Sequence, residues 1–169
     1  DMFLLKSFPN KITIVGAGFI ACEFACILHG LGVEVSQLVR GDQILRGFDF
    51  ELSSALTEAM KNRGVKIIFG EGISSLEGTP GSLTIKTNTG KEFDSNGLLF
   101  ATGREPFLEG LKLEQAGIEI FNNTIKVDSE SKTNISNIFA IGDVTDRINL
   151  TPVAIDEGRK FADRIYGKS

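Results

Sequence analysis

The sequence predicts an α/β fold in which a parallel β-sheet is covered by helices. Three observations support this prediction: short runs of β-branched residues, apolar residues at helical spacing between those runs, and glycines where the elements end. Over about the first seventy residues the order is strand, helix, strand, helix, strand. This order is typical of a doubly wound, Rossmann-like parallel sheet with right-handed crossovers.

The first elements follow from local sequence. Lys11–Val15 is rich in β-branched residues, which favour strands. In 19–29 the apolar residues recur at helical spacing, and Gly30 and Gly32 are expected to end that helix. Residues 33–39 alternate between apolar and polar, so a second strand is expected there.

The second helix, 49–63, carries Leu52, Leu56 and Met60 on one face, and we expect these three side chains to point inward. After the third strand, turn residues at 88–90 join two alternating runs and predict a small antiparallel meander. The remaining predicted elements are strand 65–69, meander strands 82–87 and 91–94, strand 98–101, a brief helix at 111–116, strands 124–127 and 138–141, and a closing helix at 152–166.

The chain is expected to hold two parts. Residues 1–104 contain the complete alternation of strands and helices, whereas 105–169 contain strands and one helix but no complete βαβ unit. We therefore predict a nucleotide-binding Rossmann-like domain at 1–104, and at 105–169 a portion of a second, larger domain.

Composition excludes several classes of function. With 18 basic and 22 acidic residues the formal charge is -4, which disfavours nucleic-acid binding by bulk charge. Apolar runs are shorter than the roughly 18 residues of a membrane span, and no secretory signal is visible, so no membrane partner is expected. Two cysteines and one histidine predict neither a disulfide framework nor a metal site. We expect a reducing, cytoplasmic location.

A glycine motif follows the first strand directly. Gly16, Gly18 and Ala21 form G-x-G-x-x-A: the first glycine permits a tight turn, the second admits a pyrophosphate, and the small third residue permits close helix packing. The helix start then offers free N–H groups to the phosphates. The alternative is a purely structural turn, but the strand–turn–helix context favours dinucleotide binding.

Two arginines indicate which dinucleotide is bound. Arg40 ends the second strand, where enzymes that prefer NAD usually carry an acidic residue, and Arg46 follows shortly after. Guanidinium groups bind a 2′-phosphate by forked hydrogen bonds, so NADPH is favoured. Two alternatives remain open: both arginines are solvated loop residues, or Asp42 serves as a distant acid for NAD.

Five separated segments together resemble the pyridine nucleotide-disulfide oxidoreductases, class I. They are 16–24 (GAGFIACEF), Arg40 with 44–49 (ILRGFD), 101–106 (ATGREP), 133–143 ending in Gly-Asp, and 150–154 (LTPVA). The last segment resembles the branch of glutathione, trypanothione and large thioredoxin reductases, and the closest resemblance is to glutathione reductases. This implies an enzyme in which NADPH reduces FAD, FAD reduces a protein disulfide, and that disulfide reduces glutathione disulfide.

The resemblance also implies roles for individual residues. The segment 105–169 would be the C-terminal portion of a discontinuous FAD-binding domain. Phe19 would lie by the nicotinamide where relatives often carry tyrosine, and Glu23 would face the same pocket; an ordinary boundary charge is the equal alternative for Glu23. The residues implied to bind cofactors are Gly16, Gly18, Phe19, Ile20, Ala21, Arg40 and Arg46 for NADPH, and Gly103, Arg104, Gly142, Asp143, Leu150 and Thr151 toward FAD.

The catalytic groups of the resembled family are not in this sequence. There is no Cys-x-x-x-x-Cys pair and no His-Glu pair, so no catalytic residue is expected in this chain and we expect it to be a fragment. Cys22 and Cys26 are expected to be packing residues, and His29 a surface residue at a helix end. The implied partners are the remaining FAD-domain and interface-domain segments, a second copy in a homodimer, and glutathione disulfide.

Other functions remain open at this stage. Another member of the same family, of the thioredoxin, trypanothione, mercuric or dihydrolipoamide type, differs mainly in segments that this sequence lacks. A nucleotide-sensing module without enzymatic activity would not need Asp143 or Thr151. A structural domain with a decayed site would not need the glycine turn and both arginines.

Overall fold

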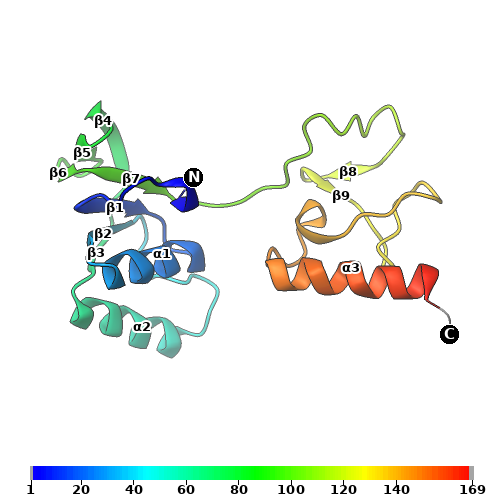
Figure 1. Cartoon of the computed structure of the whole chain (residues 1–169), viewed down its shortest axis with the longest axis horizontal. Helices are drawn as coiled ribbons and strands as arrows, with labels where there is room; N and C mark the ends of the chain where they lie inside the picture. The colour runs from blue at the N-terminus through cyan, green and yellow to red at the C-terminus, as the bar shows by residue number, and fades with distance from the viewer. Residues whose placement is uncertain (1, 168–169) are drawn as a thin grey trace. The chain divides into compact units, whose positions relative to one another are not determined.

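Four parallel strands form the sheet of the N-terminal unit. The computed structural model describes residues 2–167, and the chain divides into two compact units, 1–103 and 104–169. The strand order is β3-β2-β1-β7, with bounds β1 Lys11–Val15, β2 Glu34–Val39, β3 Lys66–Phe69 and β7 Gly97–Phe100 (Figure 1).

The two faces of this sheet are covered differently. Helices α1 (Phe19–Gly30) and α2 (Phe50–Arg63) pack with Ile12 and Ile14 on one face. On the other face Val15 and its neighbours pack against an antiparallel meander rather than a helix, because β3 leads directly into that meander. Its strands are β4 Ile73–Thr79, β5 Ser82–Thr87 and β6 Glu92–Ser95.

A buried carboxylate joins the meander to the end of β3. Glu71 is 2% exposed, and its carboxylate lies 2.8 Å from the Lys91 ammonium and from the Thr89 hydroxyl. The Lys91 ammonium, together with Thr87 and Thr89, lowers the pKa of Glu71 from 4.5 to about 2. The ionised carboxylate is therefore part of the native packing.

Polar side chains bind backbone groups at both ends of α2. Asp49 is the N-cap of α2, and its carboxylate accepts hydrogen bonds from the N–H groups of Glu51 and Leu52. Beyond the other end of α2, the Nε2 atom of His29 lies 2.6 Å from the carbonyl oxygen of Arg63. His29 is half-buried and contacts the C-terminus of α2, so the expectation of a surface residue was wrong.

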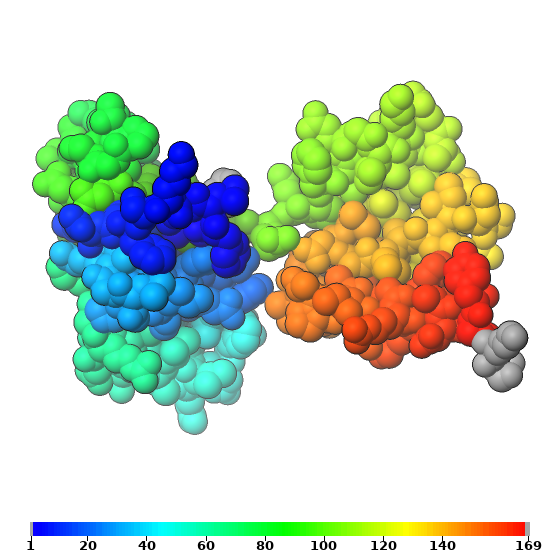
Figure 2. Space-filling view, in the orientation of Figure 1, coloured from blue at the N-terminus to red at the C-terminus, as the bar shows by residue number. Residues whose placement is uncertain are grey.

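The C-terminal unit contains few regular elements. A two-stranded ribbon, β8 (Ile120–Phe121) and β9 (Thr124–Ile125), a short 3₁₀ turn, η2 (Gly142–Thr145), and helix α3 (Thr151–Tyr166) surround a small core. A separate 3₁₀ turn, η1 (Met2–Leu4), lies in the N-terminal unit. Helix α3 has no buried residue and lies on the surface of its unit (Figure 2).

Several sequence predictions were wrong. Residues 111–116 form turns with hydrogen bonds between residues three apart, such as Ala116 N–H to the Leu113 carbonyl, instead of a helix. Residues 138–141 form one isolated bridge, Lys132 to Phe139, because no further strand among the described residues pairs with them. Leu52 is 56% exposed rather than inward, since the first turn of α2 buries the neighbouring Ser53, whose hydroxyl donates to the Ile44 carbonyl, while Met60 packs in the core.

Cysteine burial also differs from the expectation. Cys22 is buried and packs in the core, whereas Cys26, one turn later, is exposed and is not a packing residue. Burial raises the pKa of the Cys22 thiol, and a hydrogen bond from Gln37 opposes that rise. Among residues 2–167, the structure has no helix with the length and apolar character to span a bilayer.

Candidate functional site

The turn between β1 and α1 requires glycine at its first position. Gly16 has φ +145°, and a Cβ added there would lie 2.2 Å from the carbonyl oxygen of Ala101 at the end of β7. The same Cβ would lie 3.3 Å from the side chain of Ala21, which is fully buried. The turn thus lies so close to the end of β7 and to α1 that no side chain fits at Gly16, as the G-x-G-x-x-A spacing predicts.

All three carbonyl oxygens of the turn accept hydrogen bonds from the protein. The Gly16 oxygen accepts from the Gln37 side-chain amide at 2.9 Å, the Ala17 oxygen from the Leu45 N–H at 2.6 Å, and the Gly18 oxygen from the Cys22 N–H at 3.1 Å. In a trans peptide the C=O and N–H point in opposite directions. The N–H groups of residues 17, 18 and 19 therefore point away from these partners.

The turn leaves room for a ligand beside Gly18. This residue is exposed, has an ordinary extended backbone, and nothing lies within 4 Å of the position that a Cβ would take. Gly18 is also the N-cap of α1 and makes no side-chain cap, so the first N–H groups of the helix have no intrahelical partner. Phe19 is 36% exposed and Ile20 half-buried beside this opening. A phosphate fits this arrangement of free donors.

Arg40 and Arg46 flank the same end of the sheet. Both side chains are exposed, and among the residues that the structure describes no carboxylate is within 4.0 Å of either guanidinium. The loop that carries Arg46 is tied to the glycine turn by Leu45, a non-glycine residue with φ 51°. Asp42 and Glu23 are exposed as well.

In the C-terminal unit, Arg104 and Asp143 form an ion pair. An Arg104 guanidinium nitrogen donates to one oxygen of the Asp143 carboxylate at 2.9 Å, and both side chains stay partly exposed. The pair borders a small cavity of about 230 Å³ that Pro106, Phe107 and Asn149 also line. One carboxylate oxygen of Asp143 makes no such contact and is free to accept from a hydroxyl group.

The backbone around Asp143 is held by a residue that the sequence analysis missed. Gly142 has φ +70°, and a Cβ there would lie 3.1 Å from the side chain of Ala154 in α3. Its N–H donates to the Glu157 carboxylate at 2.7 Å, and Arg147 lies 3.5 Å from the same carboxylate. Glu157 lies six residues beyond Thr151 in α3 and outside the segments that resemble the family, so no motif spacing pointed to it.

The other predicted residues are Leu150 and Thr151 at the start of α3, and Gly103, the last residue of the N-terminal unit. Leu150 is the N-cap of α3 in extended conformation without a side-chain cap, and Pro152 occupies the first turn. Thr151 is exposed, so its N–H at the helix start has access to a ligand. Gly103 is exposed, with open space where a Cβ would be.

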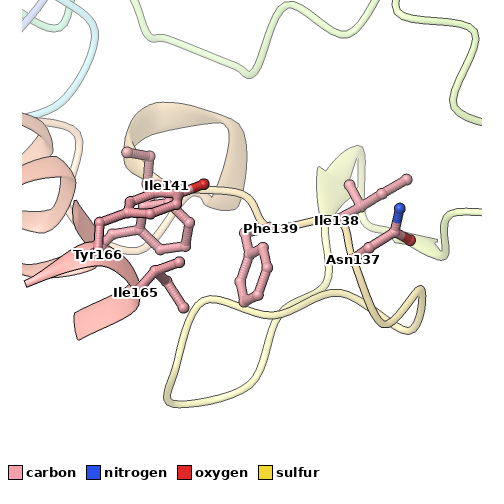
Figure 3. A pocket seen from close by; sticks show the side chains of 7 residues that line it. Asn137, Ile138, Phe139, Ile141, Ile165 and Tyr166 are labelled. Carbon is pink, nitrogen blue, oxygen red and sulfur yellow. The ribbon is translucent and has the colours of Figure 1, made fainter. Parts of the chain in front are cut away.

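A second hollow in the C-terminal unit is apolar. It has a volume of about 480 Å³ and lies between 137–141 and the last turns of α3 (Figure 3). Phe139 and Phe161 pack there with ring centroids 4.9 Å apart, while Tyr166 stays 80% exposed. This hollow has no charged group and no polar network, so it is uncovered apolar surface rather than a site for chemistry.

Comparison with known proteins gives relatives over the whole chain. Glutathione reductase of Burkholderia cepacia is 45% identical over 168 residues, which cover 99% of this chain and 37% of that protein. Glutathione reductase of Nostoc sp. is 42% identical, with 100% of this chain and 40% of the relative covered. Trypanothione reductase of Trypanosoma congolense is 40% identical, with 99% and 35% covered. The chain thus spans at most about two fifths of the length of these relatives.

A solved structure and a family model agree with these relatives. The HOCl-induced flavoprotein disulfide reductase of Escherichia coli superimposes with a TM-score of 0.89 at 27% identity, over 99% of this chain and 39% of that chain. The family model described as pyridine nucleotide-disulphide oxidoreductase matches residues 1–158. This chain therefore belongs to the pyridine nucleotide-disulphide oxidoreductase family.

Proposed function

We propose that the N-terminal unit binds NADPH at the turn between β1 and α1. The observation that carries this proposal is the orientation of the turn: three successive carbonyls are bonded inward, which leaves the opposite N–H groups and the helix start free for a pyrophosphate. The space beside Gly18 admits that group. Phe19 and Glu23 would then border the nicotinamide.

The two exposed arginines support NADPH over NADH. Arg40 and Arg46 have no acidic partner among the described residues, so a 2′-phosphate would meet two guanidinium groups that need not break an existing ion pair. Asp42 would favour NAD only if its carboxylate bound the ribose in place of the contacts from the two arginines. The arrangement therefore favours the phosphorylated coenzyme.

In the C-terminal unit the residues fit an FAD molecule. Asp143 offers an unoccupied carboxylate oxygen to hydroxyl groups, and Thr151 offers a backbone N–H at a helix start. Gly103, Arg104, Gly142 and Leu150 would shape the surroundings of these two groups. When bound, FAD would carry electrons between the nicotinamide and a disulfide.

For the whole protein we propose NADPH-dependent reduction of glutathione disulfide. The relatives named glutathione reductase, at 45% and 42% identity, support this substrate. The trypanothione reductase at 40% identity makes trypanothione disulfide the second candidate. The redox disulfide and the His-Glu pair would be supplied by segments outside this sequence, in a homodimer located in the cytoplasm.

The coenzyme proposal is tested by calorimetric titration of this chain with NADPH and NADH. We expect tighter binding of NADPH, and a loss of about tenfold in NADPH affinity for Arg40→Gln and for Arg46→Gln, because each removes a charged hydrogen bond. Arg63→Gln is the matched control, since this exposed arginine lies at the end of α2. Equal affinity for both coenzymes, or equal losses in all three variants, would contradict the proposal.

The substrate proposal is tested separately with the complete protein. NADPH oxidation is measured with glutathione disulfide and with trypanothione disulfide, and the ratio of kcat/KM identifies the substrate. The 169-residue chain is the control, and we expect no turnover from it because its two cysteines lie on one helix, one buried and one exposed. Turnover of glutathione disulfide by this chain would refute the proposal that the redox disulfide and the His-Glu pair come from segments outside this sequence.

A further inference from the structure

A single polar side chain interrupts the apolar face that β2 presents to α1. Successive residues of a strand point to opposite faces, so Gln37 lies in one row with Val35 and Val39. Both valines belong to the core cluster that includes Ile14, the partner of Gln37 in β1. Gln37 is 0% exposed. An apolar residue would be the ordinary occupant of this position.

The amide of Gln37 is only partly satisfied there. Its Nε2 donates to the carbonyl oxygen of Gly16 at 2.9 Å and lies 3.7 Å from the sulfur of Cys22. Its Oε1 is buried and has no hydrogen-bond partner among the residues that the structure describes. A buried polar atom without a partner lowers stability, so an apolar side chain of equal size would serve the core better.

We propose that Gln37 is a positioning residue for the pyrophosphate site of the dinucleotide. This inference rests on the proposed binding of NADPH at the glycine turn. The hydrogen bond from Gln37 fixes the direction of the Gly16 carbonyl, and the opposite N–H of the same peptide, that of Ala17, is thereby aimed toward the ligand. The amide thus acts on the phosphate through the backbone and does not contact it.

The conformational freedom of glycine explains why such a tie is needed. The peptide between Gly16 and Ala17 follows a residue without a side chain, which can rotate among many backbone conformations. Leu45 ties the next peptide, since its N–H donates to the Ala17 carbonyl. With both ties in place, neither peptide has to be ordered when the phosphates bind, which increases affinity.

The test compares Gln37→Met with the unmodified chain, since methionine matches the length of glutamine and has no N–H donor. We expect unfolding stability to be equal or higher and NADPH affinity to fall about tenfold. Adenosine 2′-monophosphate, which has the 2′-phosphate but no pyrophosphate, should bind equally to both proteins. Gln37→Leu is a second variant in case methionine packs poorly.

Thr13→Val is the matched control. Thr13 is buried in the same sheet, on the face opposite to Gln37, and its hydroxyl donates to the Ser95 hydroxyl at 3.1 Å. The substitution removes this buried hydrogen bond without altering the glycine turn, so NADPH affinity should not change. A loss of affinity in this control would mean that binding follows stability in general and would overturn the inference.

The outcomes separate the inference from the function on which it rests. If the unmodified chain does not bind NADPH, the proposed function fails and the inference fails with it. If it binds but both Gln37 variants bind equally well, only the positioning role is refuted. Marked destabilisation in both variants, or a parallel loss of adenosine 2′-monophosphate binding, would show that the amide serves the fold and would also refute that role.

Discussion

Exchange of the two glycines of the turn for alanine should have opposite consequences. Gly16→Ala places a Cβ 2.2 Å from the Ala101 oxygen and 2.8 Å from its carbon, at φ +145°. Gly18→Ala places a Cβ in open space on a backbone that any residue adopts. The first change should therefore affect stability, and the second should affect ligand binding.

The size of each effect follows from these contacts. Backbone strain at a positive φ costs about 1–3 kcal/mol, and displacement of the β7 end adds to it, so Gly16→Ala should cost about 3 kcal/mol. For Gly18→Ala the weaker N-cap and the reduced entropy of the unfolded chain nearly offset each other, within about 0.5 kcal/mol. Its added Cβ would occupy the space proposed for the pyrophosphate, and NADPH affinity should then fall at least about tenfold.

Amide hydrogen exchange in β1 measures the free energy of unfolding of the N-terminal unit by itself. A loss of about 3 kcal/mol corresponds to roughly 150-fold faster exchange of core amides such as that of Ile14. Calorimetry measures NADPH affinity in parallel. Unchanged exchange in Gly16→Ala would refute the close approach to β7, and unchanged affinity in Gly18→Ala would refute the approach of a phosphate at that residue.

Three further outcomes are expected. The folded-state pKa of Glu71 is lowered from 4.5 to about 2, so its stabilisation is present above pH 4.5 and is lost as the pH falls toward 2. Urea unfolding at several pH values should show this loss, and Lys91→Met should weaken it. Glu157→Ala should cost the C-terminal unit about 1–3 kcal/mol, measured by exchange of the Ala140 amide, whereas Glu157→Gln, which retains an acceptor for Gly142, should cost less. The apolar hollow beside α3 should bind the dye ANS in this chain, and lack of dye binding by a monomer would contradict its exposure.

The sequence predicted the sheet and helices of the first hundred residues well because their partners lie close along the chain. The predicted strand at 11–15 agrees with β1, and the predicted helix at 19–29 agrees with α1 to within one residue. Each crossover there is complete, so local pattern and tertiary pairing favour the same element. Residues 138–141 have a strand-like pattern but only one bridge in the structure, since a strand needs neighbours that this part of the chain does not offer.

The residues that support the candidate site were harder to predict than the residues that form it. Gly16 and Gly18 belong to a motif with fixed spacing, whereas Gln37 is one polar residue in a predicted strand and belongs to no motif. Glu157 belongs to no motif either, because the group that it binds is the backbone N–H of Gly142, fifteen positions away. Side chains that bond to backbone groups leave no repeated pattern in a single sequence.

The hydrogen bonds of the turn explain why the motif leaves the residue between its two glycines, here Ala17, unspecified. The hydrogen bonds on either side of Ala17 use backbone groups of the turn: the Ala17 carbonyl accepts from the Leu45 N–H, and the preceding Gly16 carbonyl accepts from Gln37. Arg46 follows Leu45 directly, so the same backbone bond links the proposed 2′-phosphate contact to the proposed pyrophosphate contact. Because Leu45 has φ 51°, a conformation that costs free energy in a non-glycine residue, its geometry is retained only when surrounding contacts enforce it. Recognition of the dinucleotide would then depend on two ties, from β2 and from the arginine loop, that hold the two successive peptide groups on either side of Ala17.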